Sequence, residues 1–170
     1  MLMKKIKFLC FAFLVSIALN SCSKYDEGPC ISFKSMEKRL IGLWEFSSIS
    51  VNSVEYITQY KDSCNLKLSI SGNKEELFII LVEYNRNSPQ LSSSIITISD
   101  DGEEITFALP ERAMYSDITQ SFYEIIPAFA EKQEWEINRL TSKELFLSAT
   151  YKEQPYVLKL EKTKKYIFNQ

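Results

Sequence analysis

The sequence predicts an all-β fold, an eight-stranded up-and-down antiparallel β-barrel, and three observations support this prediction. From about residue 40 onward, apolar residues recur with a period of two. β-Branched and aromatic residues are concentrated in short runs between turn formers. Tight turns and long joins alternate along the chain, as they do when successive strands run up and down around one barrel.

Eight segments have the composition of strands, and the alternation is clearest at Leu66, Leu68 and Ile70. The run "LFIILV" (77–82) is apolar on both faces, which predicts that its outer face is covered as well. The expected strands are 42–51, 64–70, 76–84, 94–99, 103–109, 133–140, 144–150 and 156–162.

The joins between these strands predict a barrel with one elaborated end. Three joins are tight hairpins marked by "SGNKE", "DDG" and "TSK", and the joins after the first, third and fifth strands are long. Successive joins of an up-and-down barrel lie at alternate ends. We therefore expect the long loops to share one end, the rim, and the three tight turns to share the other, the floor.

Two short helices are expected in addition. The segment "SMEKRLIG" (35–42) begins with Ser35, a good N-cap residue, and precedes the first strand, so it should cross the floor. The segment "SDITQSFYEIIP" (116–127) has Asp117 as a cap and ends at Pro127 in the longest rim join. This second helix either closes the rim as a lid or packs on the outside of the barrel.

The N-terminus has the pattern of a secretory signal peptide covering residues 1–21. Three lysines precede a run of twelve residues without a charge (8–19), which is short for a membrane-spanning helix. Residues 1–21 hold three of the 20 basic side chains and none of the 22 acidic ones, so their removal leaves a net charge of −5. That charge does not favour binding to nucleic acid.

The residues "LNSC", ending at Cys22, resemble the lipobox of bacterial lipoproteins. The resemblance implies that Cys22 carries lipid and tethers the mature chain to the cell envelope, most often at the outer membrane, in either leaflet. Residues 22–33 would then be a tether and 34–170 the barrel domain. An ordinary secretory cleavage site beside an unmodified cysteine is the alternative.

Two cysteines remain after this processing, Cys30 and Cys64. In an oxidising compartment they could form a disulfide. They could equally be two buried thiols that act as small apolar residues.

The segment "RLIGLWEF", with Gly42 and Trp44, resembles the opening of lipocalins, in which a short helix leads into a Gly-x-Trp motif at the barrel floor. Together with "WEINRLTSKELFL" and "YVLKLEK" near the end, it resembles the lipocalin-like lipoproteins of Gram-negative bacteria. Two features of lipocalins are absent: a Thr-Asp-Tyr turn before the seventh strand and an arginine near the end of the last strand.

Arg139 follows Trp135 and Ile137 at a period of two, so we expect its guanidinium to lie against Trp44 and complete the floor. The alternative is an arginine that reaches into water at the end of its strand.

The chain has no histidine, which excludes catalytic sites that need a histidine base and metal sites that need imidazole. The acidic run Asp100–Glu104 is explained by a hairpin turn and lacks the ligand spacing of a calcium loop. No set of residues in the sequence points to a reaction, a metal or a cofactor, so we do not expect an enzyme.

Two functions remain. In the first, a small apolar or amphipathic ligand occupies the barrel, lined by inward residues of several strands: Leu66, Tyr84, Phe107, Leu109, Trp135, Leu147 and Tyr156. In the second, aromatic side chains, 13% of the chain, fill the barrel, and its outside docks another envelope protein. A cavity of a few hundred cubic ångströms would favour the ligand, and a filled barrel with an exposed apolar patch would favour the partner.

Overall fold

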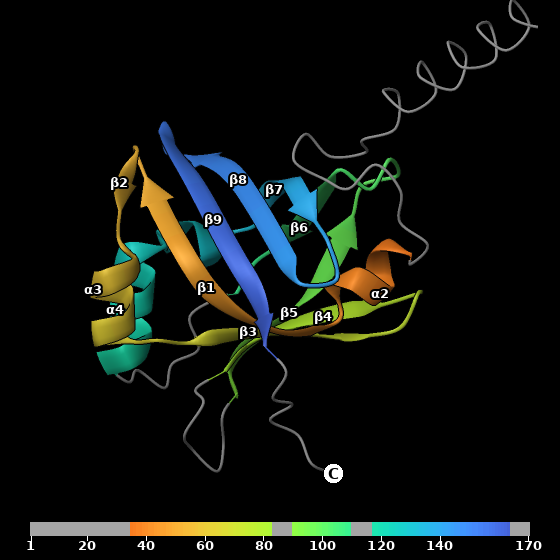
Figure 1. The fold of residues 1–170 in the computed structure, drawn as a ribbon, viewed down its shortest axis with the longest axis horizontal. Coiled ribbons are helices and arrows are strands. Elements are labelled where there is room, and N and C mark those ends of the chain that lie inside the picture. The colour runs from red at the N-terminus through yellow and green to blue at the C-terminus, as the bar shows by residue number, and fades with distance from the viewer. Residues whose placement is uncertain (1–34, 83–89, 110–116, 164–170) are drawn as a thin grey trace, which may run out of the picture.

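A computed structural model describes residues 35–82, 90–109 and 117–163, which form one closed barrel (Figure 1). The strands form a single sheet in the order β2-β1-β3-β4-β5-β6-β7-β8-β9, and β1 also pairs with β9. All pairings are antiparallel. The strands are β1 (Gly42–Val51), β2 (Val54–Glu55), β3 (Lys67–Gly72), β4 (Leu77–Val82), β5 (Gln90–Ile98), β6 (Glu104–Phe107), β7 (Gln133–Leu140), β8 (Glu144–Tyr151) and β9 (Gln154–Thr163).

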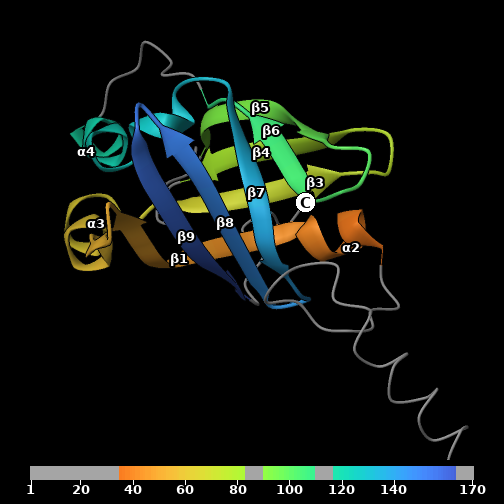
Figure 2. The ribbon, with the colours of Figure 1, turned by 90° about the horizontal axis from the view of Figure 1, so that it is seen from above.

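The helices lie at the two ends of this barrel. They are α2 (Met36–Leu40), α3 (Ile57–Ser63), α4 (Asp117–Ile125) and a 3₁₀ turn, η1 (Pro127–Phe129). Figures 1 and 2 show α3 and α4 side by side at one end and α2 at the other. None of the helices in the described segments is both long and apolar enough to span a membrane.

The predicted fold class is confirmed, because eight strands that follow one another in the chain close into an antiparallel, lipocalin-like barrel. The expected strands 42–51 and 133–140 coincide with β1 and β7. The helix-bearing joins share the rim, and the tight turns before β4, β6 and β8 lie at the floor beside α2. The third long join, 83–89, lies outside the described residues.

Three elements were missed from the sequence: η1, and two that lie in the first rim join, β2 and α3. β2 folds back on the end of β1 through a turn in which Asn52 and Ser53 have positive φ angles. The helix α3 has no side-chain cap, and it is fixed instead by Tyr60, which is fully buried and donates its hydroxyl to the Leu66 carbonyl at 2.6 Å. Because α3 takes up Ile57–Ser63, the next strand begins at Lys67 and not at Cys64.

The strand β5 begins at Gln90, four residues before the expected start at 94. Serines 92–94 lie inside it, although serine has no preference for strands. Pairing of β5 with the apolar strand β4 along Leu77–Val82 outweighs this local tendency.

Candidate functional site

The described residues among those suggested as ligand-lining lie inside the barrel, and there they are tightly enclosed. A cavity large enough for a ligand leaves accessible surface on the side chains that line it. Tyr84 lies outside the described residues. The other members of the set each expose 2% of their surface or less: Leu66, Phe107, Leu109, Trp135, Leu147 and Tyr156.

Phe129 of η1 fills the space beneath the rim. Its ring centroid lies 5.0 Å from that of Trp135, 5.1 Å from Phe107 and 6.3 Å from Phe46. Phe122 of α4 joins the same group, 5.6 Å from Phe129. The rim helix therefore contributes aromatic rings to the core and closes the mouth of the barrel, which decides between the two placements left open for it.

Hydrogen bonds hold this rim segment against β6. The Leu109 N–H donates to the Phe129 carbonyl at 2.6 Å, and the Tyr123 hydroxyl donates to the Leu109 carbonyl at 2.6 Å. These bonds direct the chain after Phe107 toward η1. The sequence indicated the apolar face of α4 but not Phe129, which follows Pro127 and lies outside the helical pattern.

A polar atom in the filled interior has no hydrogen-bond partner among the described residues. The Trp135 indole nitrogen is fully buried and finds no acceptor. A buried donor without an acceptor costs about 1 to 3 kcal/mol, so this position would be stabilised by an ordered water or by an acceptor atom of a ligand.

The floor is built around Trp44, which is fully buried and donates its indole N–H to the Leu40 carbonyl at 2.7 Å. Lys162 lies opposite Trp44 in the β1–β9 ladder, with its ammonium nitrogen 4.5 Å from the centroid of the indole ring. The same ammonium group donates to the carbonyls of Arg39 and Ile41, the latter at 2.7 Å.

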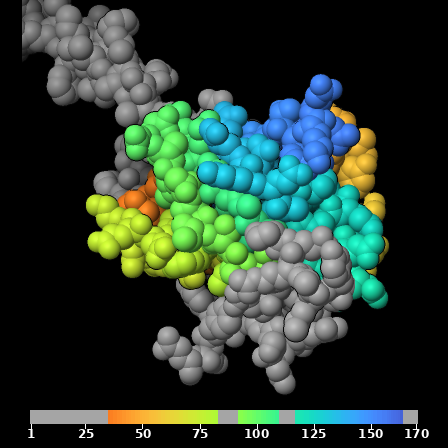
Figure 3. Space-filling view, turned by 180° about the vertical axis from the view of Figure 1, so that it is seen from behind, coloured from red at the N-terminus to blue at the C-terminus, as the bar shows by residue number. Residues whose placement is uncertain are grey.

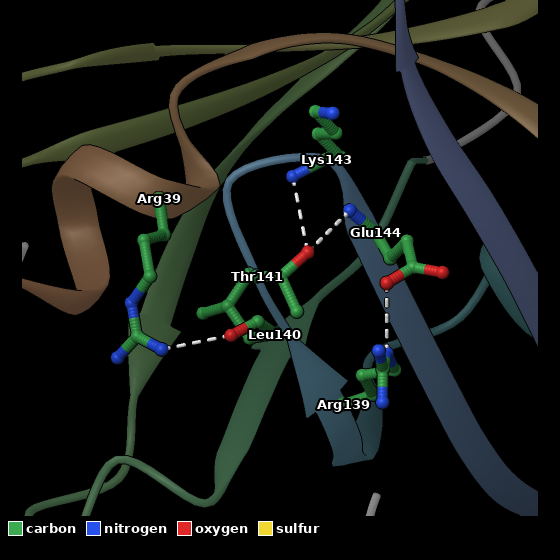
Figure 4. Close-up of polar contacts among 6 residues, drawn as sticks. All are labelled: Arg39, Arg139, Leu140, Thr141, Lys143 and Glu144. Carbon is green, nitrogen blue, oxygen red and sulfur yellow. Dashed lines mark hydrogen bonds and ion pairs between the residues drawn. The ribbon is translucent and has the colours of Figure 1, made fainter. Parts of the chain in front are cut away.

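Gly42 leaves room for this lysine. A Cβ atom at Gly42 would lie 3.0 Å from Cδ of Lys162 and 2.9 Å from its Cε, the latter closer than Cβ atoms approach other atoms, so the lysine side chain would have to shift. Gly42 also has a φ of +149°, which favours glycine. Beside it, Arg39 of α2 donates to the Leu140 carbonyl at 2.8 Å and ties the floor helix to the end of β7 (Figure 4).

Arg139 does not take the place expected for it against Trp44. The β7–β8 ladder shifts register between Ile137 and Arg139, so the alternation changes and Leu140 points inward instead. Arg139 lies on the outer face, where its Nε is 2.9 Å from Oε2 of Glu144 (Figure 4). Its guanidinium carbon is 5.7 Å from the ring centroid of Phe146.

Lys162 occupies the position over Trp44 that we had assigned to an arginine. The sequence contained a signal for it, because Tyr156, Leu158, Leu160 and Lys162 follow one another at a period of two on the inward face.

Cys64 is a free thiol that follows α3. It is buried, and its Sγ lies 3.4 Å from the Tyr60 carbonyl oxygen, to which it donates. Burial raises the pKa of the Cys64 thiol to about 11. Cys30, the other member of the suggested disulfide, lies outside the described residues, as does Cys22.

A cluster of acidic side chains lies on the outer face of β6 and β7. The side chain of Glu104 shares a hydrogen bond with Glu134. This hydrogen bond raises the pKa of Glu104, and so do the negative charges of Glu134, Asp101 and Glu136. The described residues hold no cluster of three groups placed to bind a metal ion. The Asp101 carboxylate accepts from Ser99 Oγ at 2.6 Å and from the Glu103 N–H at 3.0 Å, as in a hairpin turn.

The outside of β4 and β5 carries an apolar pair. Phe78 and Ile95 face each other across the ladder and expose 37% and 52% of their surfaces. Figure 3 shows this side of the molecule, where β4 is yellow-green and β5 is green. Beside Ile95 is an open groove of about 510 Å³, which runs along the end of β5 and the turn before β4.

These features, a closed eight-stranded barrel with a floor helix and a Gly-x-Trp floor, define a lipocalin-like fold. No family model and no curated protein matches the chain. Among solved structures, japanin from Rhipicephalus appendiculatus bound to cholesterol is similar at a TM-score of 0.48 and 10% identity, covering 77% of this chain and 80% of japanin. A lipocalin-like protein from Bacteroides uniformis is similar at a TM-score of 0.40 and 15% identity, covering 74% of this chain and 99% of the other.

Proposed function

We propose that this protein is a non-enzymatic interaction module of the bacterial cell envelope, which is tethered by lipid on Cys22 and binds other protein through the outside of its barrel. One contrast supports this proposal. The described residues suggested as ligand-lining each expose 2% or less, whereas Phe78 and Ile95 stand exposed as a pair on the outer sheet face. An apolar face that no part of the described chain covers is typical of an interaction surface.

The composition of this face supports the same function. β4 and β5 together contain no charged residue, from Leu77 to Val82 and from Gln90 to Ile98. Solvent-facing sheet surfaces usually alternate apolar and polar residues, with charges among the latter. A partner that covers Phe78 and Ile95 would remove their apolar surface from water without stripping any charge in these strands of its hydration.

The tether is tested by Cys22→Ala. The variant should appear in the soluble fraction or stay unprocessed, and the natural protein should incorporate a radiolabelled fatty acid. A natural protein without label would show that Cys22 is not the anchor.

A second candidate function is supported by the Trp135 indole. A small, mostly apolar ligand with one acceptor atom could bind beneath Phe129 if the rim segment moved, and its acceptor would satisfy the buried N–H. Trp135→Phe keeps an aromatic ring, a smaller one, and removes the donor, so it should weaken the binding of such a ligand. Native mass spectrometry of the purified protein should then show a bound mass that the variant loses.

The main proposal is tested by photo-crosslinking in cells. A photoreactive amino acid in place of Phe78 should capture a protein, whereas the same residue in place of Val157, exposed to 38% on β9, should not. Equal capture at both positions, or no capture at Phe78, would contradict docking through this face. A ligand mass in the native spectrum with no capture would favour the second candidate.

A further inference from the structure

The outer face of the sheet is buried where β1 and β3 meet. Trp44 of β1 points into the barrel, so its neighbours Leu43 and Glu45 point outward. Leu43 lies opposite Ser69 in the β1–β3 ladder, and Glu45 lies opposite Lys67. Residues that are opposite each other in a ladder share a face, so Ser69 and Lys67 point outward as well. Leu43 exposes 5% of its surface, and Ser69 and Lys67 expose 9% each.

β4 continues this buried outer face and also shows where it ends. Val82 lies opposite Lys67 and is fully buried. Ile80, the next outward residue of β4, is half-buried, and Phe78 after it is exposed. The exposure therefore rises along the outside of β4, and whatever covers the face stops short of Phe78.

The described helices do not account for this cover. They lie at the rim and at the floor, and none of them lies across the outside of β3 and β4 (Figures 1 and 2). Elsewhere the outside of the barrel is open to water, since the outward residues Val157, Lys159 and Glu161 of β9 are all exposed. The Lys67 ammonium pairs with Glu45, but the pairing alone does not bury the aliphatic stem of a lysine whose side chain is only 11% exposed.

We propose that the C-terminal tail, residues 164–170 ("KKYIFNQ"), crosses the outside of β1 and β3 and covers this face with Tyr166, Ile167 and Phe168. β9 ends at Thr163, which lies opposite Leu43, so the chain leaves its last strand at the border of the buried face. Three strand spacings, about 14 Å, separate β9 from β4 in the order β9-β1-β3-β4. An extended chain of seven residues spans about 23 Å, so the tail is long enough.

The charges beside the buried face are complementary to the start of the tail. Glu45 and Glu161 are opposite each other in the β1–β9 ladder, where two like charges destabilise the pair. Lys164 and Lys165 follow Glu161 by three and four residues, and a tail that turns back over β1 brings their ammonium groups toward both carboxylates. The three apolar residues come next and meet the apolar part of the face. This inference does not depend on the proposed function, because it concerns the sheet face beside the exposed pair of β4 and β5.

Cysteine labelling tests the cover. Ser69→Cys is made in the full-length protein and in a variant that ends at Thr163, and both are purified in mild detergent. A maleimide should label the new cysteine slowly in the full-length protein and about ten times faster or more in the shortened one, because the tail no longer protects it. Peptide mass spectrometry distinguishes this cysteine from the native ones.

Two further variants make the labelling specific. Val157→Cys, at an exposed site on β9, should be labelled at the same rate with and without the tail. A full-length chain with Tyr166→Ser and Phe168→Ser keeps the length and the lysines of the tail, and it should expose Ser69→Cys as the shortening does. Thermal unfolding checks that each variant is folded at the labelling temperature.

A photo-crosslink gives a measurement that does not require the shortened protein to fold. A photoreactive amino acid in place of Phe168 should crosslink within its own chain to a peptide of β3 or β4, whereas the same amino acid in place of Val157 should not. A crosslink from position 168 to other strands or to a second chain would overturn the inference. Protection of Ser69→Cys that survives the loss of the tail would also overturn it and would assign the cover to residues 22–34 or 83–89.

Discussion

The barrel floor offers a quantitative test, the substitution Lys162→Met. The Lys162 ammonium donates to the carbonyls of Arg39 and Ile41 and lies 4.5 Å from the Trp44 ring centroid. Methionine keeps most of the aliphatic stem and removes the charge and the donors. Both carbonyls then lose their lysine donor at a half-buried site.

The expected loss of stability is the sum of two contributions, and water replaces part of each. A hydrogen bond to a charged group contributes about 1.5 to 3 kcal/mol and a half-exposed cation–π contact about 0.5 to 1 kcal/mol. Water can reach part of the site, so we expect a net loss of about 2 to 3 kcal/mol. For a domain of this size, 1 kcal/mol corresponds to roughly 3 to 4 °C, which gives a decrease in Tm of roughly 6 to 12 °C.

The assay is thermal unfolding followed by circular dichroism, with two matched controls. Lys159→Met removes an exposed lysine that lies 5.1 Å from the Phe146 ring on the outside, and it should change Tm by less than about 2 °C. Lys162→Arg retains the charge and should recover part of the loss. If Lys162→Met melts within about 2 °C of the natural protein and of Lys159→Met, the floor lysine does not contribute as argued.

Three further predictions concern single sites. Gly42→Ala should lower Tm, because its Cβ meets Lys162 and its φ is unfavourable for alanine, and in the double variant with Lys162→Ala the two losses should be less than additive in thermal unfolding. With a pKa of about 11, Cys64 is about one part in a thousand thiolate at pH 8, so iodoacetamide should label its peptide only after denaturant is added, and rapid labelling of the folded protein would contradict this burial. Because the pKa of Glu104 is raised in the folded state, its stabilising contribution is present at low pH and is lost as the pH rises through that pKa. Glu104→Gln should therefore melt higher than the natural protein at pH 7.5 and equal to it near pH 3, and an equal difference at both values would refute the coupling.

The strands and the alternation of loops could be predicted from the sequence because they depend on local pattern. The period of two gives the ends of β1 and β7, and turn formers such as Gly102 mark the hairpins. The helix α3 could not be predicted in this way. Its seven residues have no capping side chain, and Tyr60 secures it through rings that lie far along the chain, at 5.0 Å from Phe46 and 6.1 Å from Phe122.

In the candidate site, too, some features follow from local pattern and others depend on contacts between distant parts of the chain. Inward positions such as Leu66 and Leu147 were assigned from periodicity and are buried. Whether they enclose a ligand depends on Phe129, which enters the barrel from a segment that no repeating pattern identifies. Arg139 was assigned to the floor by a period that the β7–β8 register shift interrupts, and a register shift depends on the partner strand.

The floor and the short β5–β6 ladder are opposite consequences of how this barrel closes. β1 and β9 pair from Leu43 to Val51, almost along their whole length, and only this closure places Lys162 beside Gly42 and Trp44. The floor contacts therefore join the beginning of the described chain to its end and stabilise the closed sheet. Between β5 and β6 the ladder has two positions, because the aromatic rim segment that fills the interior holds Leu109 away from β5. The same packing that removes space for a ligand inside the barrel thus limits the β5–β6 ladder to two positions among the described residues.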